Sequence, residues 1–118
     1  MQNFENPLFI IPISSGVIFV ITGYIMLKFP PKKINPLYGY RTPNSMKNQE
    51  RWDFAQRYSA LEMIKCGALM CFVGLLGLIV YPDHMLAMFL GLGLLFLIVI
   101  LLFIRVERAI SRKFKQEQ

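Results

Sequence analysis

Apolar residues gather in three long runs, and charged residues are concentrated between and after them. The first run, residues 8–27, and the third, residues 85–104, contain no charged side chain. Because an α-helix rises about 1.5 Å per residue, roughly 20 apolar residues are needed to cross the hydrocarbon core of a bilayer. This pattern predicts membrane spans at about residues 8–28 and 85–104.

The second run, residues 66–81, is uncharged but short for a span. We expect the helix to begin near residue 60, with the Lys65 side chain extending toward the lipid headgroups. The span is therefore predicted at 60–81, and a link of only Pro82 to His84 makes it an antiparallel hairpin with the third span. The predicted fold is an all-α, three-span transmembrane bundle that forms a single domain over residues 1–118.

A signal peptide is the competing interpretation of the first run. That run is long for a signal peptide, acidic Glu5 rather than a cation precedes it, and Lys28 follows it without a small-residue cleavage site. We expect the segment to be retained as a span.

The hydrophobic fraction is 55%, the charged fraction 17% and the formal net charge +6. Of the 13 Lys and Arg residues, all but Lys65 lie either in the segment between the first two spans (Lys28, Lys32, Lys33, Arg41, Lys47, Arg51, Arg57) or after the third (Arg105, Arg108, Arg112, Lys113, Lys115). Short cytoplasmic loops are enriched in Lys and Arg. We therefore predict an outer N-terminus, a cytoplasmic segment 29–59 and a basic cytoplasmic tail 105–118. Contact with anionic lipid accounts for the charge without a nucleic-acid partner.

The sequence lacks the usual short catalytic and phosphate-binding motifs, so no enzyme activity, metal or cofactor is expected. Cys66 and Cys71 are five residues apart in an apolar helix, which is not a redox or zinc spacing. His84 is expected in a solvated turn. Glycines recur seven residues apart in the first two spans, at Gly16, Gly23, Gly67 and Gly74, and predict close helix packing there.

Between the first two spans, prolines predict an extended entry and Gly39 predicts a tight turn. Thr42 followed by Pro43 is a plausible helix cap and first helical position, with Asn44 or Ser45 as alternative caps. An interfacial amphipathic helix is therefore predicted from about Pro43, and whether it bends before the second span is left open.

One face of this helix would carry Glu50, Phe54 and Tyr58. The other would carry Trp52, Ala55, Gln56 and Ser59, with Trp52 as an anchor at the membrane surface. Arg41 would lie beside outward-facing N–H groups at the helix start, which would suit an anion or a carboxylate. Lipid phosphate and Glu50 are the alternative partners for Arg41.

Glu62 and Lys65, three residues apart at the entry to the second span, are a possible intramembrane pair. The default interpretation is structural, and the sharper one is a proton-coupled role for Glu62. The latter would suit a small transporter or channel subunit that acts as an oligomer.

One ordered motif stands out between the first two spans. It comprises Asn35, Gly39, Tyr40, Arg41, Thr42, Ser45, Met46, Lys47, Asn48, Glu50 and Trp52. In residue order and spacing this motif resembles the hallmark of the SdpI family of small bacterial membrane proteins, and the likeness covers roughly residues 7–105. One departure is Ala55-Gln56, where the family would have Ala-Asn.

The resemblance implies a location in the bacterial plasma membrane and a role in immunity and signal transduction. The family's namesake protects a bacterium from its own secreted peptide toxin and holds a cytoplasmic repressor at the membrane. A related role implies a peptide toxin and a repressor-like protein as partners, with homo-oligomerisation left open.

Besides immunity with signalling and a transporter or channel subunit, a third hypothesis is an enzyme. It would act on lipid headgroups through Arg41, Ser45, Asn48 and Glu50.

Overall fold

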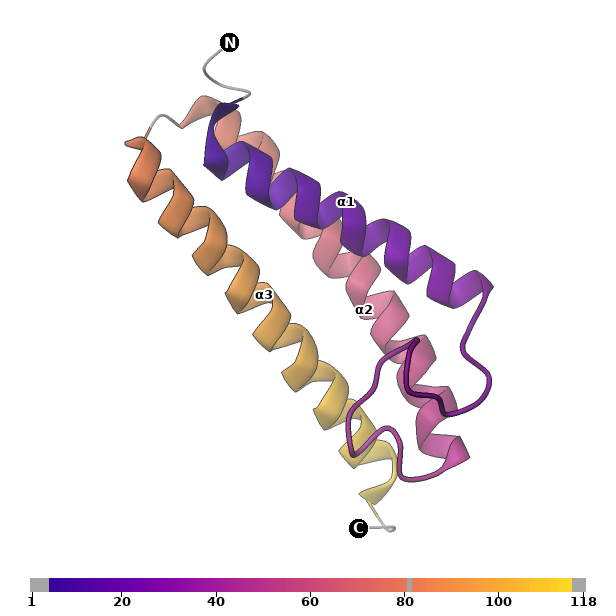
Figure 1. The fold of residues 1–118 in the computed structure, drawn as a ribbon. Helices are drawn as coiled ribbons and strands as arrows, with labels where there is room; N and C mark the ends of the chain where they lie inside the picture. The colour runs from indigo at the N-terminus through magenta and orange to yellow at the C-terminus, as the bar shows by residue number, and fades with distance from the viewer. Residues whose placement is uncertain (1–4, 81, 116–118) are drawn as a thin grey trace.

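The computed structural model describes residues 5–80 and 82–115. Three long helices lie side by side: α1 (Pro7–Lys28), α2 (Gln49–Leu76) and α3 (His84–Lys113), and the 3-10 turn η2 (Gly77–Ile79) follows α2 (Figure 1). Each of the three is long and apolar enough to cross a membrane. The all-α, three-span fold predicted from the sequence is confirmed.

The first helix begins where its sequence favours a start. Asn6 caps α1 by accepting the backbone N–H of Leu8 at 3.0 Å, and Pro7 occupies the first helical position. The Asn6 amide also donates to the carbonyls of Gly77 and Val80, both at 3.0 Å. One side chain therefore starts α1 and ties it to the end of α2.

Small residues bring α1 and α2 into backbone contact. A Cβ added at Gly16 would lie 2.6 Å from the carbonyl oxygen of Gly67, and one added at Gly67 would lie 2.6 Å from that of Gly16. Lower along the same seam, a Cβ at Gly23 would be 2.7 Å from the carbonyl of Ala60. The predicted small-residue packing is confirmed, since no larger side chain fits between these backbones.

The helix predicted from Pro43 does not form. Residues 43–46 make a turn, and α2 begins at Gln49 with Asn48 as its cap. The Thr42 hydroxyl accepts the N–H of Ser45 while the Ser45 hydroxyl accepts that of Thr42, at 3.1 and 2.9 Å. These reciprocal bonds close a local turn in place of a helix start, which corrects the prediction.

The interfacial helix is likewise not a separate element, because α2 runs without interruption from Gln49 through the apolar segment to Leu76. Trp52 is 0% exposed and is therefore not a surface anchor. Its indole N–H donates to the carbonyl of Pro31 at 2.6 Å. Trp52, Ala55, Gln56 and Ser59 are all buried, so the face predicted to meet the membrane surface is part of the core.

The second and third helices form the antiparallel hairpin expected from their short link (Figure 1). The end predicted for the second span, Tyr81, lies outside the described residues. The third helix continues to Lys113, so the segment predicted as a tail from residue 105 is largely helical. Residues 116–118 of that segment lie outside the described part of the chain.

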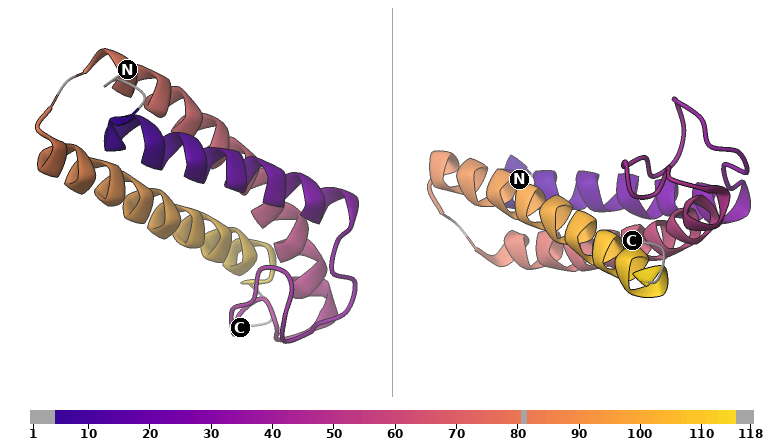
Figure 2. Two further views of the ribbon diagram at one scale, coloured as in Figure 1. Left: turned by 45° about the horizontal axis from the view of Figure 1, so that its top comes forward. Right: turned by 90° about the horizontal axis from the view of Figure 1, so that it is seen from below.

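The connection between α1 and α2, residues 29–48 and hereafter the loop, lies at the same end of the bundle as the last turns of α3 (Figure 2). A buried apolar cluster occupies this end and draws on the loop, α2 and α3; its members are Tyr40, Ala55, Leu102, Val106, Ile110 and Phe114. Elsewhere most large apolar side chains of the helices are exposed. The protein therefore contacts the bilayer along its helices and packs its core beneath the loop.

Candidate functional site

The loop enters the site through a turn built by Asn35. The Asn35 side-chain oxygen accepts the N–H groups of Leu37 and Tyr38 at 2.9 and 2.7 Å, and its amide donates to the carbonyl of Lys33 at 2.9 Å. Gly39 follows with a φ of 109°, a conformation that side chains strongly disfavour. Asn35 and Gly39 therefore set the direction in which Tyr40 leaves the turn.

The side chain of Gln56, on α2, holds Tyr40 at both backbone groups. Its carbonyl oxygen accepts the N–H of Tyr40 at 2.7 Å, and its amide donates to the Tyr40 carbonyl at 2.8 Å. Gln56 is buried, so these bonds are shielded from water. Gln56 therefore clamps the loop to α2.

The third helix holds the loop through one carboxylate. Glu107 Oε2 accepts the hydroxyls of Tyr40 at 2.7 Å and Thr42 at 2.9 Å. The Tyr40 ring packs on Phe103, with ring centroids 5.4 Å apart. Burial, and then the hydrogen bond to Glu107, raise the pKa of the Tyr40 hydroxyl, so it remains a donor.

The next motif residues close the turn before α2. Ser45 is fully buried, and its single hydroxyl proton is shared between the carbonyls of Tyr40 and Thr42, which lie 3.1 and 3.0 Å from Oγ. Met46 donates its N–H to the Thr42 carbonyl at 3.0 Å. Asn48 then caps α2 by accepting the N–H of Arg51 at 2.8 Å. The Ser45 and Asn48 side chains therefore stabilise the turn and the start of α2 through hydrogen bonds to backbone groups.

A buried arginine joins the loop to the end of α3. Arg51 is 1% exposed, donates to the side-chain oxygen of Asn44, and lies 5.4 Å from the ring centroid of Phe114. A guanidinium in this position is stabilised by both its hydrogen bonds and the aromatic face. Arg51, which the sequence presented as one of the loop-side cations, is thus a structural residue.

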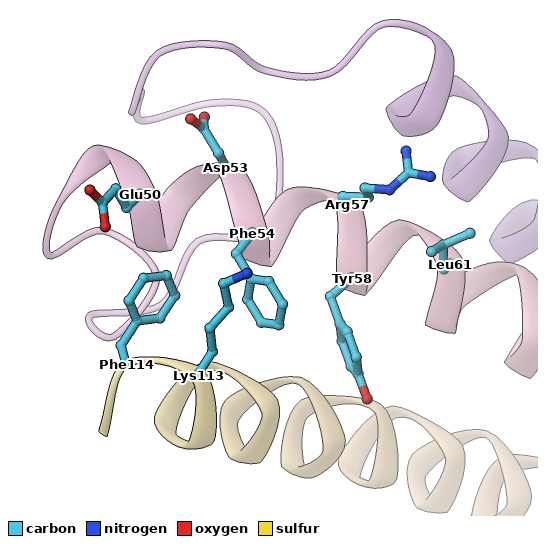
Figure 3. Close-up of a pocket in the computed structure, with 8 residues that line it drawn as sticks. All are labelled: Glu50, Asp53, Phe54, Arg57, Tyr58, Leu61, Lys113 and Phe114. Carbon is cyan, nitrogen blue, oxygen red and sulfur yellow. The ribbon is translucent and has the colours of Figure 1, made fainter. Parts of the chain in front are cut away.

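Arg41 and Glu50, two exposed charged residues of the motif, lie in different grooves. Arg41 lines a groove of about 470 Å³ with residues of α1 and α3, and its Nε donates to the carbonyl of Asn35 at 2.9 Å. Glu50 lines a groove of about 570 Å³ between α2 and α3, where Phe54 and Tyr58 stack (Figure 3). Because α2 starts at Gln49, Arg41 does not lie at a helix start as predicted.

The carboxylate of Glu62, predicted as a possible partner of Lys65, binds a second cation more closely. Arg105, on α3, donates from Nε to Glu62 Oε2 at 2.9 Å and from Nη2 to Oε1 at 3.1 Å. Lys65 Nζ lies 3.9 Å from Oε1. The bidentate contact with Arg105 is therefore the main neutralising interaction of this buried carboxylate.

The motif residues, α2 and the apolar part of α3 fall within one region of similarity to known proteins. The SdpI/YfhL protein family matches the chain over residues 32–104, which is more than half of it. The chain belongs to the SdpI/YfhL family. The resemblance inferred from the loop motif is confirmed.

A relative supports the family assignment. It is the uncharacterized protein YfhL of Bacillus subtilis (strain 168), which is 48% identical over 61 residues. The matched region is 52% of this chain and 56% of that protein, so the chain spans little more than half the length of this SdpI/YfhL relative. No solved structure matches the chain.

Sequence reasoning found the motif of the SdpI/YfhL loop but missed residues outside it that hold it in place. Gln56 and Glu107 make the side-chain bonds that fix Tyr40 to α2 and α3. Gln56 had a usable signal, because it shares a helical face with Trp52 and Ala55. Glu107 gave no such signal, because it lies in the sequence among the arginines after the third span. An acidic residue in such a segment is ordinarily expected on a solvated surface.

Proposed function

We propose that this SdpI/YfhL-family protein protects a bacterium from a secreted antimicrobial peptide and that its loop binds a cytoplasmic regulator. The observation that carries the proposal is the attachment of Tyr40 to α2 through Gln56 and to α3 through Glu107. A change in how α3 lies against α2 must alter these bonds. The membrane helices and the loop are therefore mechanically connected.

The proposed topology follows the distribution of charge. The loop and the last turns of α3 lie at one end of the bundle and carry most of the Lys and Arg residues (Figure 1). The positive-inside rule assigns this end to the cytoplasm, with an outer N-terminus. The membrane is the bacterial plasma membrane, and the loop faces the compartment in which a repressor-like partner would be found.

In the proposed mechanism, an external peptide binds the outer end or the lipid-facing surface of the bundle in one of two packing arrangements. The seam at Gly16 and Gly67 has backbone against backbone, so a bound peptide that alters it repositions whole helices. The loop changes with them because Glu107 and Gln56 hold it. Such coupling requires that the peptide binds the two arrangements with different affinity.

Arg41 offers the test of the loop's role. Its side chain is exposed, and its one hydrogen bond to a described residue goes to the carbonyl of Asn35. In a sensitive strain challenged with the toxin against which the family's namesake protects, Arg41→Ala should abolish protection or regulator capture and leave the amount of protein in the membrane unchanged. Lys33→Ala, which removes a charge from an exposed loop side chain, is the matched control.

Full protection together with unchanged regulator capture by the Arg41→Ala variant, at equal membrane abundance, would refute the proposed role of the loop. Loss of protection in both variants would also refute a specific role for Arg41, because it would show dependence on loop charge alone. Protection that survives while regulator capture is lost would separate the two parts of the proposal and retain the loop as the binding surface.

A transporter or channel subunit is the second candidate, and the buried carboxylate of Glu62 is the observation that favours it. Glu62 is 4% exposed on a membrane helix, and such carboxylates are costly unless they are partnered or used. Ion flux through the purified protein in liposomes, lost in Glu62→Gln, would support this function. Toxin protection without measurable flux would support immunity.

A further inference from the structure

Three arginines follow the apolar part of α3 on one face of the helix. Arg105, Arg108 and Arg112 are spaced by three and four residues, which places them within about 60° around the axis. Together with Ala109 and with Tyr58 from α2 they line a hollow of about 160 Å³. This hollow, hereafter the arginine hollow, is separate from the loop motif.

The N–H groups of the arginines around the arginine hollow are hydrogen-bond donors, and few of them bind an acceptor in the described part of the protein. Arg105 uses two of its N–H groups on Glu62, and 57% of its side chain remains exposed. Within residues 5–80 and 82–115, neither Arg108 nor Arg112 forms an ion pair. The nearby carboxylate of Glu107 is engaged by the loop hydroxyls on another face of α3.

A neutral donor completes the arginine hollow from the opposite helix. The Tyr58 side chain extends from α2 toward α3, as the close-up shows (Figure 3). Its hydroxyl makes no hydrogen bond with any residue that the structure describes. Lys65, beside Glu62, adds a further cation at this level. The group that fits here must therefore be an acceptor with more than one oxygen and negative charge.

The depth of the arginine hollow matches that of lipid headgroups. Arg105 directly follows Ile104, the last residue of the apolar run. The helical rise places Arg108 about 6 Å and Arg112 about 12 Å beyond Ile104. The headgroup layer on each side of the hydrocarbon core is about 5–8 Å thick. Arg105 and Arg108 therefore lie at headgroup depth, with Arg112 just beyond it.

We propose that the arginine hollow binds the phosphate of an anionic phospholipid. Guanidinium groups bind phosphate oxygens in a bidentate manner, and basic pockets between membrane helices suit acidic headgroups. The same face of α3 continues into the membrane with the exposed side chains of Leu97 and Leu101, which the acyl chains of that lipid would contact. A lipid therefore satisfies both the charged and the apolar parts of this surface.

The test compares lipid binding by the purified full-length protein with that of variants, using phosphatidylglycerol and phosphatidylcholine as probes in detergent and native mass spectrometry as the readout. Arg108→Gln combined with Arg112→Gln should weaken phosphatidylglycerol binding at least about tenfold, the loss expected for charge-assisted hydrogen bonds. The control, Lys32→Gln combined with Lys33→Gln, removes the same charge from exposed loop positions and should change binding by less than about twofold.

Tyr58→Phe separates a built site from general attraction, because it removes the hydroxyl without changing the charge. It should weaken phosphatidylglycerol binding several-fold and leave phosphatidylcholine binding unchanged. An equal loss in the arginine and lysine double variants, or no effect of Tyr58→Phe, would overturn the proposal. Complete competition by millimolar inorganic phosphate would also overturn it, since the site would then hold a free anion. Retained helicity by circular dichroism confirms that each variant is folded.

Discussion

Tyr40 of the loop donates its hydroxyl proton to Glu107 of α3 across 2.7 Å, although the two residues are 67 positions apart in the chain. The same carboxylate oxygen accepts the hydroxyl of Thr42 at 2.9 Å. Gln56 of α2 also binds the backbone of Tyr40. Tyr40 is therefore bonded to two membrane helices, and its position depends on how these helices lie relative to each other. This contact gives the family motif a structural meaning that its residue order alone does not convey.

Tyr40→Phe should destabilise the folded protein, because it removes one hydrogen bond to a carboxylate while it preserves the ring contact with Phe103. We expect a loss of about 1.5–3 kcal/mol in the free energy of unfolding, measured by denaturant titration in detergent. Tyr38→Phe is the control, since its hydroxyl donates to the carbonyl of Phe29 in an exposed setting. Equal losses in the two variants would contradict a special role for the bond to Glu107.

The pH dependence of Tyr40 gives a second prediction. Burial and the bond to Glu107 raise the pKa of its hydroxyl above the ordinary value of 10.0. A raised folded-state pKa stabilises the protein fully below the unfolded-state pKa and loses this stabilisation as pH rises through the folded-state pKa. The folded protein should therefore become less stable in strongly alkaline solution, and Tyr40 of the folded protein should stay protonated at a pH at which an unfolded tyrosine ionises.

This is measurable as phenolate absorbance in the near ultraviolet. At about pH 11 the folded wild type and Tyr40→Phe should give the same absorbance change, because Tyr40 does not contribute. In denaturant the wild type, with five tyrosines, should exceed the variant by the signal of one tyrosine. A difference of one tyrosine between the folded proteins would show that Tyr40 ionises normally.

Gly39→Ala should weaken the loop for two reasons. The φ of 109° is unfavourable for any residue with a Cβ, and the new Cβ would lie 2.5 Å from the side-chain oxygen of Gln56. We expect a loss of at least about 1–2 kcal/mol in the free energy of unfolding. Gly93→Ala is the matched control, because nothing lies within 4 Å of a Cβ at Gly93, and alanine there should be neutral or stabilising by about 0.5–1 kcal/mol.

Glu62 and Arg105 should be energetically coupled across the helices. Among the described residues, Arg105→Gln leaves the buried carboxylate of Glu62 with only Lys65, 3.9 Å away, as an ionic partner, so this variant should be less stable than the wild type. Adding Glu62→Gln removes the unpaired charge, and the double variant should be more stable than Arg105→Gln alone. Thermal unfolding of the wild type, the two single variants and the double variant in one detergent measures this coupling. Strict additivity of the two changes would contradict the ion pair as the source of stability.

Lys65→Gln distinguishes the partners of Glu62. Lys65 lies 3.9 Å from the carboxylate and its side chain is 71% exposed, so its replacement should have little effect on thermal unfolding. A larger effect from Lys65→Gln than from Arg105→Gln would restore the pair that the sequence suggested.

The sequence by itself determined the three membrane helices, because about 20 consecutive apolar residues have no stable alternative to a helix in a bilayer. It also determined the close α1–α2 seam, since Gly16, Gly23 and Gly67 lack the side chains that would hold two backbones apart. These are local properties. A run of apolar residues or a glycine spacing acts in the same way whatever the rest of the chain does.

Only the tertiary structure decided the rest. The second helix, α2, starts at Gln49 and not at the predicted Pro43, because the side chains of Thr42 and Ser45 accept each other's backbone N–H groups in a turn. The main partner of Glu62 is Arg105, 43 residues away, rather than Lys65, because α3 lies beside α2 at that level. Such contacts depend on the relative depth and rotation of packed helices, which residue spacing within one helix does not encode.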